Sequence, residues 1–131
     1  MQHKKTNRME ELTAFSIRAR KESIHFAWEG ILAFFTRQHN AIIYLVITLA
    51  VFIAALALNC SRTEFLVLIL VTGMVWSAEI FNTAIEAIMD HISPDQHPAV
   101  KFIKDVSAAA VLMAAFTALL SGLIIFIPKI L

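Results

Sequence analysis

Three stretches of the chain are almost entirely apolar, and together they define its architecture. Residues 40–61, 65–78 and 106–128 contain no charged side chain. As helices, the first and third are long enough to cross a hydrocarbon core of about 30 Å. The second is too short alone, and it continues without a break into residues 79–90, which carry three carboxylates. The pattern predicts transmembrane helices at 40–61, 65–89 and 98–127.

The segment before the first span has the periodicity of an amphipathic helix from residue 9 to residue 36. Its apolar positions are Leu12, Phe15, Ala19, Ala27, Ile31 and Phe34, and its polar stripe is Arg18, Glu22, His25 and Glu29. We expect this helix to lie in the membrane interface. A plain membrane anchor fits the same pattern equally well.

Prolines mark the remaining boundaries. Pro94 and Pro98 are four residues apart, so residues 93–98 are expected to form a turn, because one helix does not hold both prolines unbroken. Pro98 suits the first position of the third span, and Pro128 is expected to end it. Inside the first span the only polar side chains are Tyr44 and Thr48, so we expect this helix to be a passive wall.

Composition and charge support one membrane domain spanning residues 1–131. The chain is 59% hydrophobic and 16% charged, which is too apolar for a soluble domain of this size. No cleaved signal peptide is expected. Basic residues gather before the first span and at Lys101 and Lys104, whereas Arg62 and Lys129 alone fall on the other side. The positive-inside rule therefore predicts a multi-pass protein of the cytoplasmic (inner) membrane, with its N-terminus in the cytoplasm.

The cysteine and histidine content points away from a disulfide or zinc site. Cys60 is the only cysteine, so it cannot form an internal disulfide, and an inert thiol is favoured over an intersubunit bridge. The five histidines lack metal-binding spacing. No nucleic-acid partner is expected.

A polar stripe in the second span is the candidate site. At about 100° per residue, one helix face carries Glu79, Asn82, Thr83, Glu86 and Asp90. A solvated helix end explains Asp90 well, but a carboxylate at the depth of Glu79 costs about 2.5–3.5 kcal/mol unless it is partnered or neutral. We therefore favour a functional site.

Depth along the helix separates two roles for these carboxylates. Glu79 lies about 21 Å along the axis from Phe65, near the cytoplasmic boundary, and Glu86 lies about 10 Å further, at the aqueous surface. This arrangement suits a base for a lipid hydroxyl and a ligand for a metal–nucleotide. A proton-relay carrier is expected to have polar residues deeper in the bilayer. The chain has no G-x-x-x-x-G-K-[ST] loop, so phosphates would depend on carboxylate-held Mg²⁺ and on Lys104. Alone, Lys104-Asp105 is more typical of an interfacial anchor.

These residues resemble a known family. The motif is Glu79-x-x-Asn82-Thr83-Ala84-Ile85-Glu86-x-x-x-Asp90, followed by Lys104-Asp105-x-x-Ala108-Ala109-x-Val111, with Ser23, Ala27, Gly30 and Asn40 upstream. It is similar to that of the small prokaryotic diacylglycerol kinase and undecaprenol kinase family. The resemblance implies a homotrimer of three-span subunits with shared active sites. It also implies transfer of the γ-phosphoryl group of MgATP to the hydroxyl of a membrane lipid alcohol.

The resemblance also implies roles for individual residues. Glu79 matches the general base, Asn82 the polar residue beside it, and Glu86 a metal ligand. Residues matching positions that contact or frame the nucleotide are Glu86, Asp90, Asp95, His97, Lys104 and Asp105.

One departure affects the metal. The family usually has glutamate where this chain has Gln38, and Ile42 and Tyr44 replace an arginine and a histidine often found there. An amide oxygen can ligate Mg²⁺ but brings no charge. Gln38 is therefore expected to be a neutral metal ligand, unless Glu22 or Glu29 has taken over. The residues leave diacylglycerol and undecaprenol equally open as substrate, and a non-catalytic scaffold or acid-lined carrier is the alternative function.

Overall fold

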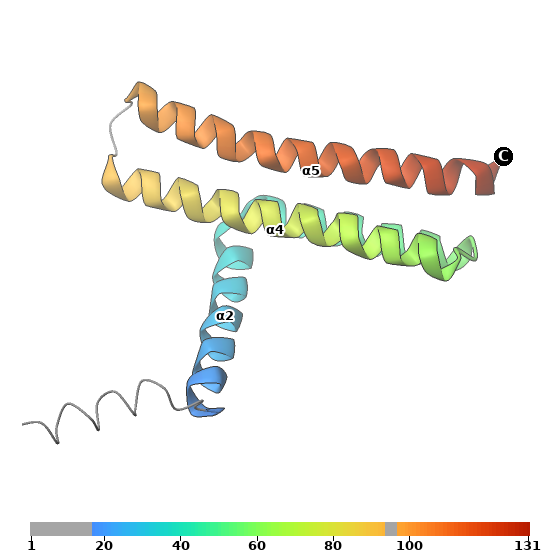
Figure 1. The fold of residues 1–131 in the computed structure, drawn as a ribbon, viewed down its shortest axis with the longest axis horizontal. Helices are drawn as coiled ribbons and strands as arrows, with labels where there is room; N and C mark the ends of the chain where they lie inside the picture. The colour runs from blue at the N-terminus through green and yellow to red at the C-terminus, as the bar shows by residue number, and fades with distance from the viewer. Residues whose placement is uncertain (1–16, 94–96) are drawn as a thin grey trace, which may run out of the picture. The chain divides into compact units, whose positions relative to one another are not determined.

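The computed structural model describes residues 17–93 and 97–131, and all their regular structure is helical. The helices are α2 (Ile17–Arg37), α3 (His39–Ala57), α4 (Arg62–Ile92) and α5 (Pro98–Ile130) (Figure 1). Three of them, α3, α4 and α5, are long and apolar enough to cross a membrane. The predicted all-α membrane fold is confirmed, and the homotrimer stays a prediction.

The chain divides into two units, residues 1–37 and 38–131, which are described separately. Within the first unit, α2 begins at Ile17, and residues 9–16 of the predicted surface helix lie outside the described part. His25 Nε2 lies 3.3 Å from Glu29 Oε1, one turn further along the helix. Large apolar side chains of this helix, including Phe26 and Trp28, are mostly exposed. Such side chains suit a helix lying in a membrane interface.

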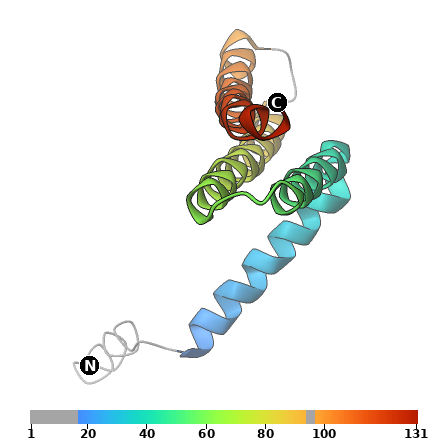
Figure 2. The same ribbon diagram turned by 90° about the vertical axis from the view of Figure 1, so that its right-hand side faces the viewer.

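In the second unit α4 lies between α3 and α5 (Figure 2). The turn from α3 to α4 lies earlier in the chain than the apolar pattern predicted, because α3 ends at Ala57 rather than at residue 61 and α4 begins at Arg62 rather than at residue 65. Asn59 adopts a left-handed conformation with φ of 51°. The amides of Asn59 and Cys60 then donate to the carbonyls of Leu56 and Ala55, which closes the helix as a Schellman motif.

Helix α4 starts immediately afterwards with a capping box. The Glu64 amide donates to Ser61 Oγ at 3.3 Å, and the Ser61 amide donates to Glu64 Oε2 at 2.6 Å. The helix then continues to Ile92, beyond the predicted end at residue 89. These caps satisfy backbone groups that an apolar environment would leave without partners.

Helix α5 begins at Pro98, as predicted, but Pro128 does not end it. The helix continues to Ile130. Proline removes one amide donor and crowds the preceding turn. Here it falls in the last turn, where Leu131 N still donates to Ile127 O at 3.2 Å. A proline so close to the end therefore disturbs little of the helix.

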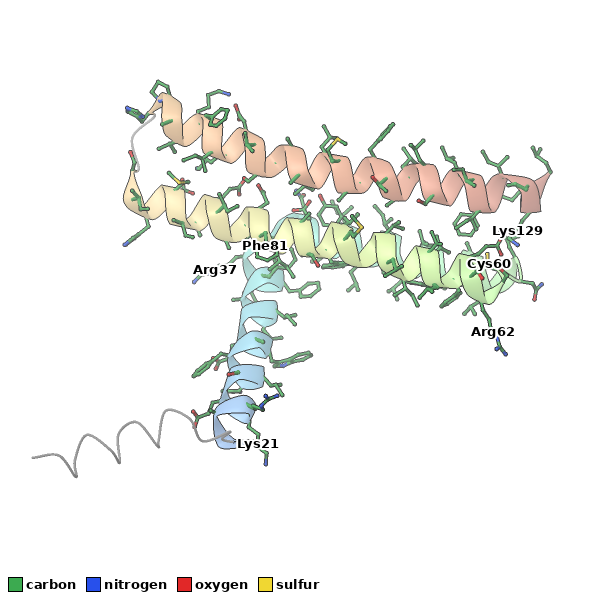
Figure 3. The ribbon with its side chains drawn as sticks, in the orientation of Figure 1. Lys21, Arg37, Cys60, Arg62, Phe81 and Lys129 are labelled. Atoms are coloured by element: carbon green, nitrogen blue, oxygen red, sulfur yellow. The ribbon has the colours of Figure 1, made fainter. Side chains whose placement is uncertain are left out.

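The end of the bundle opposite the polar stripe is held by charge and by packing. Lys129 Nζ lies 3.1 Å from Glu64 Oε2, which joins the end of α5 to the start of α4. Beneath this ion pair is a small apolar core of Ala55, Leu68 and Ile125. Figure 3 shows Cys60, Arg62 and Lys129 gathered at this end. The two basic residues predicted to share a side therefore do so.

Candidate functional site

Glu79 is partly buried on α4. The Tyr44 ring of α3 packs against Trp76 of α4, with ring centroids 6.3 Å apart. One turn before Glu79, Trp76 donates its indole N–H to Thr48 Oγ1 at 3.0 Å. Both interior polar side chains of the first span therefore contact Trp76 of α4, and the expectation that this span is a passive wall stays a prediction.

Asn82 and Glu86 form a second polar group, and it is directed toward α5. Asn82 Nδ2 donates to Glu86 Oε1 at 3.2 Å. Ser107 of α5 is 8% exposed, and its hydroxyl lies 2.6 Å from Asn82 Oδ1 and 2.9 Å from the Lys104 carbonyl oxygen. The bond to Asn82 fixes which end of that amide faces Glu86, because an amide that accepts through Oδ1 must present Nδ2 to the carboxylate.

Two ion pairs of the described residues lie where α4 ends and α5 begins. Lys104 Nζ contacts Asp90 Oδ1, which links the two helices. Lys101 Nζ contacts Asp105 Oδ2 within α5. Lys104 keeps 32% of its side chain exposed and Asp90 keeps 65%, so solvent reaches this pair. A phosphate approaching from solution would meet Lys104 first at its ion pair with Asp90.

Two further residues, His97 and Asp95, were predicted to contact or frame the nucleotide. His97 caps α5, since its Nδ1 accepts the amide of Ala99 at 3.2 Å. This bond commits one ring nitrogen to the helix start. Asp95 lies outside the described residues.

The predicted metal ligands Glu86 and Gln38 both lie in the part of the chain that the structure describes, and their role stays a prediction. Gln38 is partly buried at the extended position before α3, and its side chain makes no cap hydrogen bond. In this part of the chain, no three acidic, histidine or cysteine side chains group closely enough to hold a metal ion. Mg²⁺ often takes only one or two protein carboxylates and completes its shell with phosphates and water. Glu86 fits that smaller requirement.

A groove of about 740 Å³ lies on a different side of α4. It runs between α4 and α5 and is lined by Ile69, Leu70, Gly73, Met74, Ser77, Ala78, Ala110, Met113, Ala114 and Thr117. Ser77 lies about 160° around the helix from Glu79 at 100° per residue. Ser77 therefore does not share a helix face with Glu79.

The sequence pattern missed four contributors to the site. Tyr44 and Thr48 contact Trp76, one turn before Glu79, and Ser107 contacts Asn82. A signal was present in the spacing, because Tyr44 and Thr48 are one turn apart on α3, as Trp76 and Glu79 nearly are on α4. Matching these two faces required the register between the helices.

The part of the chain that is similar to known proteins includes the candidate site on α4 and α5. A family model described as prokaryotic diacylglycerol kinase matches residues 25–126. The chain is 34% identical over 110 residues to the undecaprenol kinase of Bacillus subtilis (strain 168), covering 84% of this chain and 89% of that protein. It is also 34% identical over 110 residues to the diacylglycerol kinase of Synechocystis sp., covering 83% of this chain and 63% of that protein. The chain thus spans less than two thirds of the Synechocystis relative. The diacylglycerol kinase of Pseudomonas aeruginosa is 37% identical over 90 residues, covering 68% of this chain and 72% of that protein.

Proposed function

The chain belongs to the prokaryotic diacylglycerol kinase family, and on that premise we propose that it is an ATP-dependent kinase of a membrane lipid alcohol. Three kinds of group follow one another along α4 in the order that this reaction needs. Glu79 is partly buried within the apolar part of the helix, Asn82 and Glu86 follow, and Asp90 meets Lys104 at the exposed end. The position of Glu79 is the observation that carries the proposal.

The chemistry follows from these positions. Glu79 accepts the proton of the lipid hydroxyl as its oxygen attacks the γ-phosphorus of ATP, the bond to the bridging oxygen breaks, and ADP leaves. Asn82 donates a hydrogen bond to Glu86 and so orients this carboxylate toward the nucleotide. Lys104 exchanges Asp90 for phosphate oxygens and offsets their charge. Glu86, with Gln38 as a neutral second ligand, would hold Mg²⁺, which neutralises charge developing on the phosphates.

Orientation and assembly belong to the same proposal. The N-terminus and the loop before α5 face the cytoplasm of an inner membrane, because Lys101 and Lys104 lie at that end and Lys129 at the other. The active enzyme is a homotrimer with shared sites. Support comes from the sparse ligand set, because the described residues of one chain hold no group of three acidic, histidine or cysteine side chains that could bind a metal ion.

The lipid is either diacylglycerol or undecaprenol. The relatives are named for both substrates, and both present a primary alcohol. Glu79 can serve either hydroxyl, so the choice depends on the apolar part of the substrate.

The test is ATP turnover by purified protein in mixed micelles containing each lipid in parallel. We expect phosphorylated lipid from at least one of them, and Glu79→Gln should lower turnover by about 100-fold or more, since general-base catalysis contributes on that scale. Glu64→Gln is the matched control, because it changes a carboxylate at the far end of α4 while keeping a side chain that completes a capping box. Near-normal turnover in a folded Glu79→Gln protein would end the base assignment. Failure of the wild type to phosphorylate either lipid would favour a scaffold or carrier.

A further inference from the structure

Trp76 is the largest side chain on the face of α4 that continues from Glu79 toward the start of the helix. At about 100° per residue, this face carries Thr72, Val75 and Trp76, all within about 60° of Glu79. Trp76 is three residues from Glu79, which is about 4.5 Å along the axis. A lipid whose hydroxyl reaches Glu79 extends its hydrocarbon in this direction, because the hydrocarbon stays in the apolar core of the bilayer. The part of the lipid next to the hydroxyl therefore lies at the level of Trp76.

Contacts with α3 hold the indole ring in place. Trp76 donates its N–H to Thr48 Oγ1 at 3.0 Å. Its ring packs edge-on against Tyr44, with ring centroids 6.3 Å apart and planes at 69°. The N–H is the only hydrogen-bond donor of a tryptophan side chain, and Thr48 already uses it. At this level Trp76 thus offers a lipid an apolar ring surface and no donor.

The two candidate lipids differ in the atoms that reach this level. In undecaprenol, the carbons beyond the hydroxyl form an isoprene unit, which is wholly hydrocarbon. In diacylglycerol, the same position holds ester groups, whose carbonyl oxygens accept hydrogen bonds. An acceptor that is taken out of water without a donor costs free energy. A fixed ring without a donor therefore favours the isoprene unit over the esters.

We propose that Trp76 is a residue that determines lipid specificity: its ring packs against the first isoprene unit of a polyprenol and disfavours the esters of diacylglycerol. This deepens the proposed lipid-kinase function and rests on it, because the level of the lipid is set by its hydroxyl at Glu79. The substrate class is then a long-chain polyprenol. Thr48 contributes by occupying the indole N–H.

The first test compares kcat/KM for undecaprenol and for diacylglycerol in mixed micelles. Trp76→Leu removes the ring and keeps the span apolar. We expect the ratio of kcat/KM for undecaprenol to that for diacylglycerol to fall by about tenfold, at the lower end of the discrimination that an apolar pocket gives. Phe81→Leu is the matched control, because this ring of the same helix is 69% exposed and lies about 160° around the helix from Glu79.

A second variant keeps the ring and releases its donor. In Thr48→Val the indole N–H loses its partner on α3. kcat/KM for diacylglycerol should then rise, because an ester carbonyl gains a donor, while kcat/KM for undecaprenol changes less. Trp76→Leu should instead act mainly by lowering kcat/KM for undecaprenol.

Three outcomes would overturn the role of Trp76 and leave the kinase in place. The first is a wild type that prefers diacylglycerol. The second is an equal ratio in the wild type, Trp76→Leu and Phe81→Leu. The third is an equal loss for both lipids in Trp76→Leu, because packing alone would then explain it.

A binding measurement tests the same contact without turnover. The chain has two tryptophans, so growth of the Trp28→Phe variant with 5-fluorotryptophan labels position 76 alone. Without ATP, undecaprenol should shift the ¹⁹F signal in micelles in a saturable way, at mole fractions where diacylglycerol leaves it in place. A signal that undecaprenol does not move would overturn the proposal. A shifted signal in a protein that phosphorylates neither lipid would support the contact with the polyprenol and reject the kinase function.

Discussion

The hydroxyl of Ser107 offers a sharp test of how the polar group beside Glu79 is built. Ser107→Ala removes the donor to Asn82 Oδ1, 2.6 Å away, and leaves the α5 backbone unchanged. The Lys104 carbonyl that the hydroxyl also reaches is a helix acceptor, so it loses less. Asn82 is then free to turn its amide, and Glu86 loses the N–H that holds its Oε1 at 3.2 Å.

The size of the effect differs between stability and activity. An interhelical hydrogen bond of a membrane protein contributes about 0.6 kcal/mol on average and about 1.7 kcal/mol at most, so unfolding in micelles should change only slightly. Loss of a residue that orients a metal ligand typically lowers metal affinity or activity by 10–100-fold. Ser107 acts on Glu86 through Asn82, so we expect the loss of metal affinity in Ser107→Ala to be at the lower end of this range, about tenfold.

The assay is a Mg²⁺ titration of lipid-kinase activity, together with thermal unfolding, for the wild type and Ser107→Ala. The half-maximal Mg²⁺ concentration should rise while the unfolding midpoint moves little. Thr117→Val is the control, because that hydroxyl on the same helix bonds only to the Met113 carbonyl of α5, at 2.9 Å. An unchanged Mg²⁺ midpoint in Ser107→Ala, or an equal shift in Thr117→Val, would refute the link from Ser107 to the metal position.

Two further outcomes follow from the metal position and from the predicted topology. Gln38→Glu should lower the half-maximal Mg²⁺ concentration and change the maximal rate less, because a hard cation gains a charged ligand; a flat midpoint combined with loss of activity in Glu29→Gln would instead assign the ligand to α2. In intact cells a membrane-impermeant thiol reagent should label Cys60 from outside, and it should fail to label Ser93→Cys in a Cys60→Ser background. Labelling of both positions from the same side would contradict the three-span topology.

Most of the architecture followed from the apolar runs, and its errors fell at helix ends. Residues 40–61 had no charge to mark an end, so the stop at Ala57 depended on Asn59 taking a left-handed conformation. At Pro128 the expected break did not occur, because a proline in the last turn has few bonds to disrupt. Local hydrogen bonding decided these boundaries, and hydrophobicity alone does not report it.

The family was predicted from the motif at residues 79–90 and 104–111, and that prediction is confirmed. The partners of the stripe were not predicted. Glu79 and Asn82 are about 60° apart around the helix, close enough to count as one face. Since α4 lies between two neighbours, its rotation directs Trp76 to Thr48 of α3 and Asn82 to Ser107 of α5. Which neighbour receives which residue depends on helix rotation, which no single-helix pattern contains.

The two ends of the bundle use charge for opposite purposes. At the far end, Glu64 closes the capping box of its own helix and also pairs with Lys129. The side chains of Lys129 and Glu64 are 23% and 30% exposed. These bonds join the two helices. At the site end, Lys104 and Asp90 pair in the open, and exposed ion pairs contribute about 0–1 kcal/mol. A phosphate oxygen can therefore replace Asp90 on Lys104 at little cost, whereas the carboxylate of Glu64 is also held by the Ser61 amide. The ion pair that a phosphate could displace, Lys104–Asp90, therefore lies at the candidate site, and the ion pair that joins α4 to α5, Lys129–Glu64, lies at the opposite end.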